Sequence, residues 1–113
     1  MIHAVQSITC NFSTEGMLYL AYMPFVKGGG LFLRTKNTYA LGSQVNLSVR
    51  LLDDPENYFI EGKVIWITPK GAQGNKPAGI GIQFTGENSR NFCNKIETYL
   101  AGMLKSTQMT DTI

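Results

Sequence analysis

Histidine and cysteine are scarce in this chain, which limits the catalytic and metal-binding chemistry that it can support. The 113 residues include a single histidine, His3, and only two cysteines, Cys10 and Cys93. A Ser-His-Asp triad, a Cys-His pair or a histidine-based metal site would have to recruit His3, which lies at a terminus that is expected to fray. We therefore expect no catalytic residues, no metal site and no bound cofactor.

The sequence also has few charged residues and no long apolar run. Charged residues make up 16% of the chain and hydrophobic residues 43%, a balance typical of a folded domain. The formal net charge of +2 lacks the concentrated basic charge of nucleic-acid-binding proteins, so no nucleic-acid partner is expected. No run approaches the ~18 apolar residues that span a membrane, and the N-terminus lacks the features of a signal peptide. These features favour one small cytoplasmic domain with reduced cysteines and no direct membrane insertion.

Alternating apolar and polar residues predict that the middle of the chain forms β-strands. Residues 45–51 alternate strictly, which gives one apolar and one polar face. Residues 58–68 are rich in β-branched and aromatic side chains, and strict alternation assigns Ile60, Val64 and Trp66 to one face. Further strands are expected at residues 5–12, 31–35 and 78–85.

Two segments have the spacing of amphipathic helices. The first is short and follows the Ser13-Thr14 pair, whose hydroxyls suit an N-cap. In the second, apolar residues recur over residues 92–104 at a period near 3.6, which predicts a stripe facing the core. The residues that follow are mostly small and polar, so we expect a domain over residues 1–105 and a flexible tail over residues 106–113. Short strands followed by one amphipathic helix favour a mainly β fold, a small β-barrel capped by the helix, with a two-layer α+β sandwich as the alternative.

Two glycine-rich segments look like ligand-binding motifs but are interpreted as structural. The run at residues 28–30 lacks the Lys-Ser/Thr pair that opens the helix of a phosphate loop, so it is interpreted as a tight turn or bulge. Gly79 and Gly81 match the start of a dinucleotide fingerprint, but the third glycine is missing and no helix is expected to follow. We expect these two glycines to let another element approach the strand closely.

The largest apolar side chains and the acidic cluster each allow a structural and a functional interpretation. Trp66 suits either core packing or an amphipathic anchor at a partner surface. The large groups at residues 22–25 follow no regular period, so one element cannot bury them all, and some should be exposed or bound. Asp53, Asp54 and Glu56 are interpreted as a solvated turn, because adjacent aspartates point in different directions and form neither a calcium loop nor an acid/base pair.

Four segments together resemble the PilZ-domain family, and within it the members that act in type IV pilus assembly. They read AYMPFVKGGGLF, GKVIWITPKGAQGN, AGIGIQF and NKIETYLAG, at residues 21–32, 62–75, 78–84 and 94–102. The resemblance implies a small six-stranded β-barrel with helical additions. It also implies a cytoplasmic protein, recruited to the inner-membrane pilus machinery, that is needed for pilus biogenesis and hence for twitching motility.

The wider family binds the second messenger cyclic di-GMP through two motifs, R-x-x-x-R and [D/N]-x-S-x-x-G. This sequence has no arginine before Arg34, so the first motif is absent. The second aligns with residues 25–30, where Phe25 and Lys27 replace the Asp/Asn and the Ser, and only Gly30 is kept. Losing two arginine contacts of about 1.5–3 kcal/mol each lowers the affinity by roughly two to four decades. We therefore expect no useful cyclic di-GMP binding, in line with the pilus-assembly members.

The function that remains is adaptor work through protein contacts. The resemblance implies two partners, namely the hexameric ATPase that drives pilus extension and, in some bacteria, an EAL-domain protein that senses cyclic di-GMP. The alternatives are a degenerate cyclic di-GMP receptor and, less favoured, an enzyme, for which no set of nucleophile, base and orienting group can be assembled. The candidate partner-binding residues are Tyr22, Met23, Pro24, Phe25, Trp66, Lys70, Met109 and Ile113.

Overall fold

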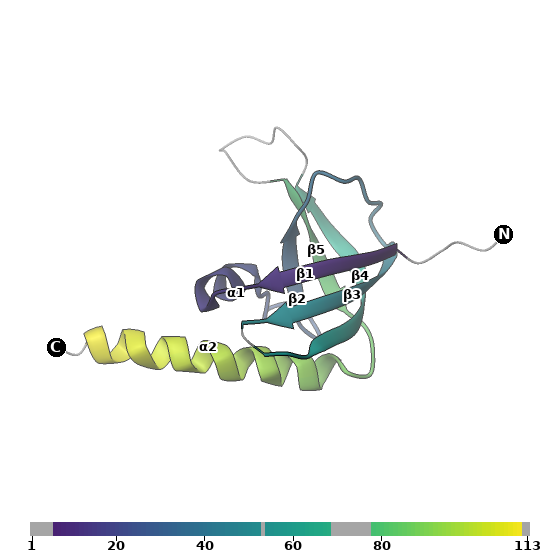
Figure 1. Cartoon of the computed structure of the whole chain (residues 1–113). Helices are drawn as coiled ribbons and strands as arrows, with labels where there is room; N and C mark the ends of the chain where they lie inside the picture. The colour runs from purple at the N-terminus through teal and green to yellow at the C-terminus, as the bar shows by residue number, and fades with distance from the viewer. Residues whose placement is uncertain (1–5, 53, 69–77, 112–113) are drawn as a thin grey trace.

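Five strands form one curled sheet, and two helices lie beside it (Figure 1). The computed structural model describes residues 6–52, 54–68 and 78–111, with the side chains of the last helix described as far as residue 102. The elements are β1 (Gln6–Phe12), α1 (Glu15–Ala21), β2 (Gly30–Arg34), β3 (Gln44–Leu51), β4 (Asn57–Thr68), β5 (Gly79–Phe84) and α2 (Ser89–Asp111).

The strands are hydrogen-bonded in the order β1-β3-β4-β5-β2. β1 pairs with β3 in parallel, while the other three pairs are antiparallel. The parallel pair requires a crossover connection, and α1 and β2 form part of that connection. As a consequence, β1 and β2 lie at the two edges of the sheet.

The prediction of a closed six-stranded barrel is wrong, whereas the mainly β class and the two helices are confirmed. The described residues form five strands, and the sheet curls into a half-barrel in which β1 and β2 do not pair. Residues 35–43, between β2 and β3, contribute no strand. One physical reason why β1 and β2 do not pair is that the start of the β2 edge is already occupied. There Tyr22 forms a β-bridge with Leu31, and the Met23 N–H donates to the Gly30 carbonyl at 2.9 Å.

The core lies inside the curl of the sheet and against α2. The strict alternation predicted for β3 is confirmed, because all four of its inward side chains are buried. From α2, Phe92, Ile96 and Leu100 recur every four residues and are buried on one face of the helix. The Phe92 ring lies 5.5 Å from the Tyr58 ring and 5.4 Å from the Phe84 ring, measured between centroids. The apolar stripe of α2 therefore closes one side of the core.

A β-bulge in β4 reverses the expected orientation of Trp66. Val64 pairs with Ile82 and Trp66 pairs with Gly81, so Ile65 is an extra residue in the strand. Because side chains alternate between faces, this extra residue sends the Trp66 side chain to the outer face, where it is 59% exposed. The prediction that Trp66 shares a face with Val64 is therefore wrong, and of the two interpretations of Trp66 the structure excludes core packing.

The first helix begins where the sequence indicates, whereas the second begins before its predicted apolar stripe. Thr14 caps α1, since its Oγ1 accepts a hydrogen bond from the Met17 N–H at 3.1 Å. α2 begins at Ser89, whose hydroxyl donates to the Gly86 carbonyl at 2.6 Å. α2 then continues through Asp111 and projects beyond the sheet (Figure 1), so it includes most of the segment expected as a tail. The division into a domain and a flexible tail stays a prediction.

Asp54 attaches α2 to the turn between β3 and β4. Its Oδ2 accepts hydrogen bonds from the Tyr58 hydroxyl at 2.6 Å and from the Tyr99 hydroxyl at 3.3 Å, and it lies 3.8 Å from Lys95 Nζ. The hydrogen bond from Tyr58 is the main reason why the pKa of Asp54 lies below its ordinary value. The expected solvated turn therefore contains one structural carboxylate, whereas Asp53 lies outside the described residues.

We expect Asp54→Asn to lower the free energy of unfolding at pH 7 and to make it less sensitive to acid. Because the native pKa of Asp54 is lowered, its contribution is fully present above the unfolded-state pKa near 3.8 and is lost as the pH falls through the native value. The amide cannot titrate, so the variant lacks this loss. Urea unfolding at pH 7 and at about pH 2.5 measures both effects.

Glu56→Gln is the matched control, since it removes a neighbouring carboxylate but keeps the main-chain N–H that donates to Asp54. It should follow the wild-type acid dependence closely. An Asp54→Asn protein that loses as much stability between the two pH values as the wild-type protein would contradict the attachment.

Candidate functional site

Gly79 and Gly81 leave a strip of β5 without side chains of its own on the outer face of the sheet. A Cβ atom at Gly79 would lie 2.5 Å from the Phe32 ring, and one at Gly81 would lie 2.9 Å from the Trp66 Cβ. Both distances are shorter than real Cβ contacts, so any larger residue would displace these side chains. The prediction that these glycines permit a close approach is confirmed.

Three large side chains cover this strip from three different segments. Besides Phe32 and Trp66, the Met23 Cε lies 3.3 Å from the Cβ position of Gly81 and 3.1 Å from that of Gly30. The Trp66 indole N–H donates to the Thr68 hydroxyl at 2.9 Å, which satisfies its polar group and leaves the ring face apolar. Met23, Phe32 and Trp66 are named the outer patch.

Residues 25–30, named the glycine turn, lead into β2 and leave the Phe25 side chain exposed to solvent. Gly28 and Gly29 have φ angles of +81° and +84°, which glycine adopts without strain. The Gln83 amide donates to the Lys27 carbonyl at 2.8 Å and fixes the turn against β5. Phe25 is 82% exposed and Lys27 is also exposed. The interpretation of the glycine run as a tight turn is confirmed.

The Tyr22 side chain is held against α2. It is half-buried, and its hydroxyl donates to Glu97 Oε2 at 2.6 Å. Burial and this hydrogen bond raise the pKa of Tyr22. Next to it, the Cys93 thiol donates to the Gly28 carbonyl at 3.3 Å. Tyr22 and Cys93 therefore hold the end of α1 and the glycine turn against α2, and a substitution at Tyr22 changes packing as well as surface.

The structure brings some of the predicted partner-binding residues together. Met23 and Trp66 meet in the outer patch, and Pro24 and Phe25 are exposed on the adjoining turn. The remaining three fall where the structure describes no side chain, although the main chain of one lies in α2: Lys70, Met109 and Ile113.

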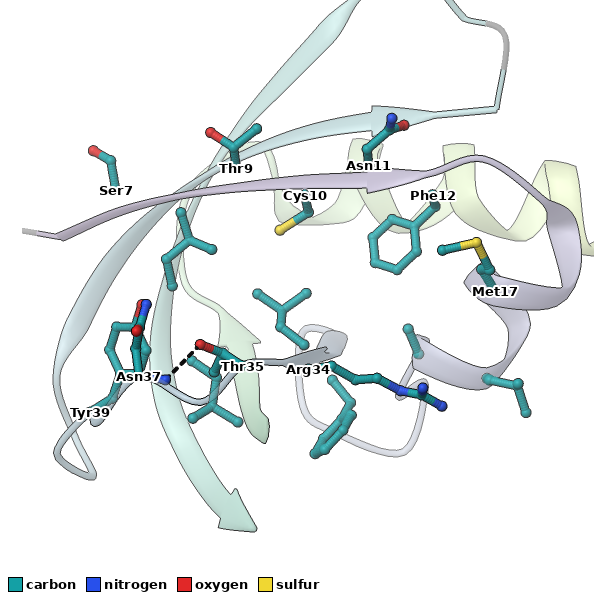
Figure 2. Close-up of a pocket in the computed structure, with 16 residues that line it drawn as sticks. Ser7, Thr9, Cys10, Asn11, Phe12, Met17, Arg34, Thr35, Asn37 and Tyr39 are labelled. Atoms are coloured by element: carbon teal, nitrogen blue, oxygen red, sulfur yellow. Dashed lines mark hydrogen bonds between the residues drawn. The ribbon is translucent and has the colours of Figure 1, made fainter. Parts of the chain in front are cut away.

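A groove opens between the two edge strands, and sequence reasoning missed it. It is a cavity of about 890 Å³ between β1 and β2, with α1 at one end (Figure 2). Cys10, Phe12 and Leu33 form part of its apolar base, and Arg34 is the one charged side chain among its described lining residues. Burial raises the pKa of the Cys10 thiol to about 12, so this thiol is neutral. No sequence pattern marks this space, because it depends on which strands become edges. This space is named the β1–β2 groove.

The described residues contain neither a metal site nor a helix that could span a membrane. Within residues 6–52, 54–68 and 78–111, no three His, Cys, Asp or Glu side chains are arranged to hold a metal ion. None of the helices in this part of the chain is long and apolar enough to cross a bilayer. Cys10 and Cys93 are both free of disulfide bonds.

The curled sheet, the glycine turn, the outer patch and the groove together describe a small, mainly β domain. The model of the PilZ domain matches residues 5–102, and the chain therefore belongs to the PilZ-domain family. PilZ domains are generally non-catalytic binding or adaptor domains, and the family is known for roles related to cyclic di-GMP. Among curated proteins, no relative matches the chain significantly.

Tyr22→Phe should lower the free energy of unfolding by about 1 kcal/mol, because it removes one hydrogen bond to a partly exposed carboxylate. Glu97→Gln keeps an oxygen acceptor and should cost less. Urea unfolding of the two single variants and the double variant gives the coupling energy between the side chains. Strictly additive losses would show that the hydrogen bond contributes nothing to the attachment of α1 to α2.

Proposed function

We propose that this PilZ-domain protein is a non-catalytic adaptor in type IV pilus biogenesis and twitching motility. It binds the ATPase that drives pilus extension and, in bacteria that have one, an EAL-domain protein that senses cyclic di-GMP. It does not bind cyclic di-GMP itself. It works in the cytoplasm, at the inner-membrane pilus machinery, and influences the ATPase only through a difference in affinity between two of its states.

The observation that carries this proposal is the chemistry of the glycine turn. Where the nucleotide-binding members of the family have Asp or Asn, this chain has Phe25, which is 82% exposed and has no hydrogen-bonding group. Lys27 replaces the serine, and a single flexible ammonium cannot reproduce the two guanidinium forks of the missing R-x-x-x-R motif. The Lys27 carbonyl already accepts a hydrogen bond from Gln83. The turn therefore favours contact with an apolar protein surface over contact with a nucleotide.

Exposed apolar side chains support binding to proteins. Trp66 is 59% exposed on a rigid strand, with its N–H already paired to Thr68. A tryptophan held in this way loses little side-chain entropy on binding, and tryptophan is enriched among residues that dominate protein interfaces. Phe25 extends the exposed apolar surface along the turn that follows Met23. These residues are the proposed contact for the ATPase.

Calorimetric titration of the purified protein with cyclic di-GMP tests the first part of the proposal. We expect no saturable heat for the wild-type protein at micromolar concentrations, because the anionic ligand lacks cationic partners. The double variant Phe25→Asp, Lys27→Ser restores the second motif and should also fail to bind, since the arginines are still missing. Saturable micromolar binding by the wild-type protein would instead identify it as a degenerate receptor.

Substitution of Trp66 tests the second part. We expect Trp66→Ala to weaken binding to the purified pilus-extension ATPase by about 30-fold, the effect of losing a hot-spot residue worth about 2 kcal/mol. Phe59→Ala is the matched control, because Phe59 is a 72% exposed aromatic residue on the same strand, before the bulge. Equal affinities of both variants and the wild-type protein, measured by biolayer interferometry, would exclude the outer patch as the contact.

A further inference from the structure

In β1, the main-chain N–H and C=O groups of every second residue point toward the groove. The Phe12 carbonyl accepts a hydrogen bond from the Leu52 N–H at 2.7 Å, so Phe12 faces β3 with its main-chain groups. Because the hydrogen-bonding direction alternates along a strand, the main-chain groups of Cys10 also face β3. The main-chain groups of Thr9 and Asn11 therefore point the opposite way, toward the groove that both residues line. Among the described residues, no strand pairs with this edge.

The main chain of β2 presents a second edge to the same groove. The Thr35 N–H donates to the Ala78 carbonyl at 3.1 Å, so the main-chain groups of the odd-numbered residues in this segment face β5. The main-chain groups of the even-numbered residues face away from β5. The Gly30 carbonyl shows this, because it accepts a hydrogen bond from the Met23 N–H on that side. Arg34 is also even-numbered, and it lies beyond the stretch that Met23 covers. Its main-chain groups therefore point into the groove.

The direction of the strands sets the geometry of any segment that enters. β1, β3 and β5 run one way along the sheet, while β4 and β2 run the other way. β1 and β2 are therefore antiparallel to each other across the groove. A strand inserted between them would be parallel to one edge and antiparallel to the other, and it would find main-chain donors and acceptors on both sides.

We propose that the β1–β2 groove binds an extended segment of a partner protein, which adds a sixth strand and closes the barrel. This inference rests on the proposed adaptor function and specifies how one partner is held. The segment has apolar residues at alternate positions, which fit the base formed by Cys10, Phe12 and Leu33. It also carries an acidic residue, because Arg34 supplies the one charged side chain among the described lining residues.

A peptide strand fits the groove better than an apolar small molecule. An acyl chain or a similar ligand would fill the base but would leave the groove-facing main-chain groups of Thr9, Asn11 and Arg34 without partners, and burying such groups unpaired is costly. An extended peptide satisfies these groups and the base together. Exposed main-chain groups at a sheet edge can pair with other chains and cause aggregation, which is why natural proteins cover such edges.

Selection from a library of random peptides of about ten residues tests the proposal, with the full-length protein as bait. Thr9→Pro is the decisive variant, because it removes a groove-facing N–H that the fold does not use, and proline is tolerated at such an edge position. Thr9→Val is the matched control, since it changes the side chain but keeps the N–H. We expect selected peptides to contain alternating apolar residues and an acidic residue, and to bind Thr9→Pro at least about tenfold more weakly than Thr9→Val.

Arg34→Glu adds a test of charge. It should weaken the acidic peptides and shift a repeated selection toward peptides with lysine or arginine. If no peptide is enriched, or if Thr9→Pro and Thr9→Val bind the selected peptides equally, the proposal is overturned.

Amide hydrogen exchange of the wild-type protein provides a readout that does not depend on any variant. In the protein alone, the Thr9 and Asn11 amides should exchange much faster than the Cys10 amide, and a selected peptide should slow them. Protection of Thr9 and Asn11 without peptide would overturn the proposal. Protection that is independent of protein concentration would mean that the chain covers its own edge, and protection that grows with concentration would mean that a second copy does.

Binding to the two proposed partners separates this inference from the adaptor function. If Thr9→Pro binds the ATPase and the EAL-domain protein as tightly as Thr9→Val does, strand addition is overturned while the adaptor function stands. If selected peptides occupy the groove but neither protein binds, strand addition stands and the assignment to the pilus machinery fails.

Discussion

Within the described part of the chain, the hydrogen-bonded ladder of the sheet ends at β1 on one side and at β2 on the other, and the other elements are arranged around these two edges. Tyr22 and Met23 cover the start of the β2 edge, which prevents β1 from pairing there. α1 then lies at one end of the space between the edges, because it connects a strand at one edge to a strand at the other. A half-barrel with an open side is the result, and unpaired main-chain groups on an open side favour recognition of an extended chain.

The molecule has two surfaces of different chemistry on either side of β2. The outer patch is an apolar surface of two aromatic side chains and one methionine that pack over glycines, so a partner would have to fit the shape of these side chains. The β1–β2 groove offers main-chain hydrogen bonds and a single positive charge. Phe32 belongs to both, since its ring covers Gly79 and the residue is also part of the groove lining. An adaptor needs separate contacts for two partners, and a shared residue provides a physical route by which one contact affects the other.

α2 joins the parts that carry these surfaces. Three of its side chains reach different segments: Tyr99 reaches Asp54 after β3, Glu97 reaches Tyr22 at the end of α1, and Cys93 reaches the Gly28 carbonyl. Phe92 and Ile96 fill the core beneath the sheet at the same time. The helix therefore stabilises the glycine turn and the position of Met23 without lying on either surface. Disturbing these contacts would change the presentation of the outer patch as well as the stability of the protein.

Local patterns predicted where the strands and helices lie, except for the C-terminal end of α2, but they did not predict how these elements pack together. The alternation in β3, the cap at Thr14 and the stripe of α2 follow from neighbouring residues, so they could be predicted from the sequence. The outward turn of Trp66 could not, because a bulge depends on how β4 pairs with a distant strand. The partners of Asp54 and Tyr22 are likewise far away along the chain or across the fold.

The sequence by itself determined the chemistry available to this protein. It contains one histidine, no arginine before Arg34, and glycines where the chain must turn or allow a close approach. Only the tertiary structure decided which strands became edges, which face Trp66 occupies and where the groove opens. The physical reason is that composition and spacing act between near neighbours, whereas strand order and register are set by the free energy of packing the whole sheet.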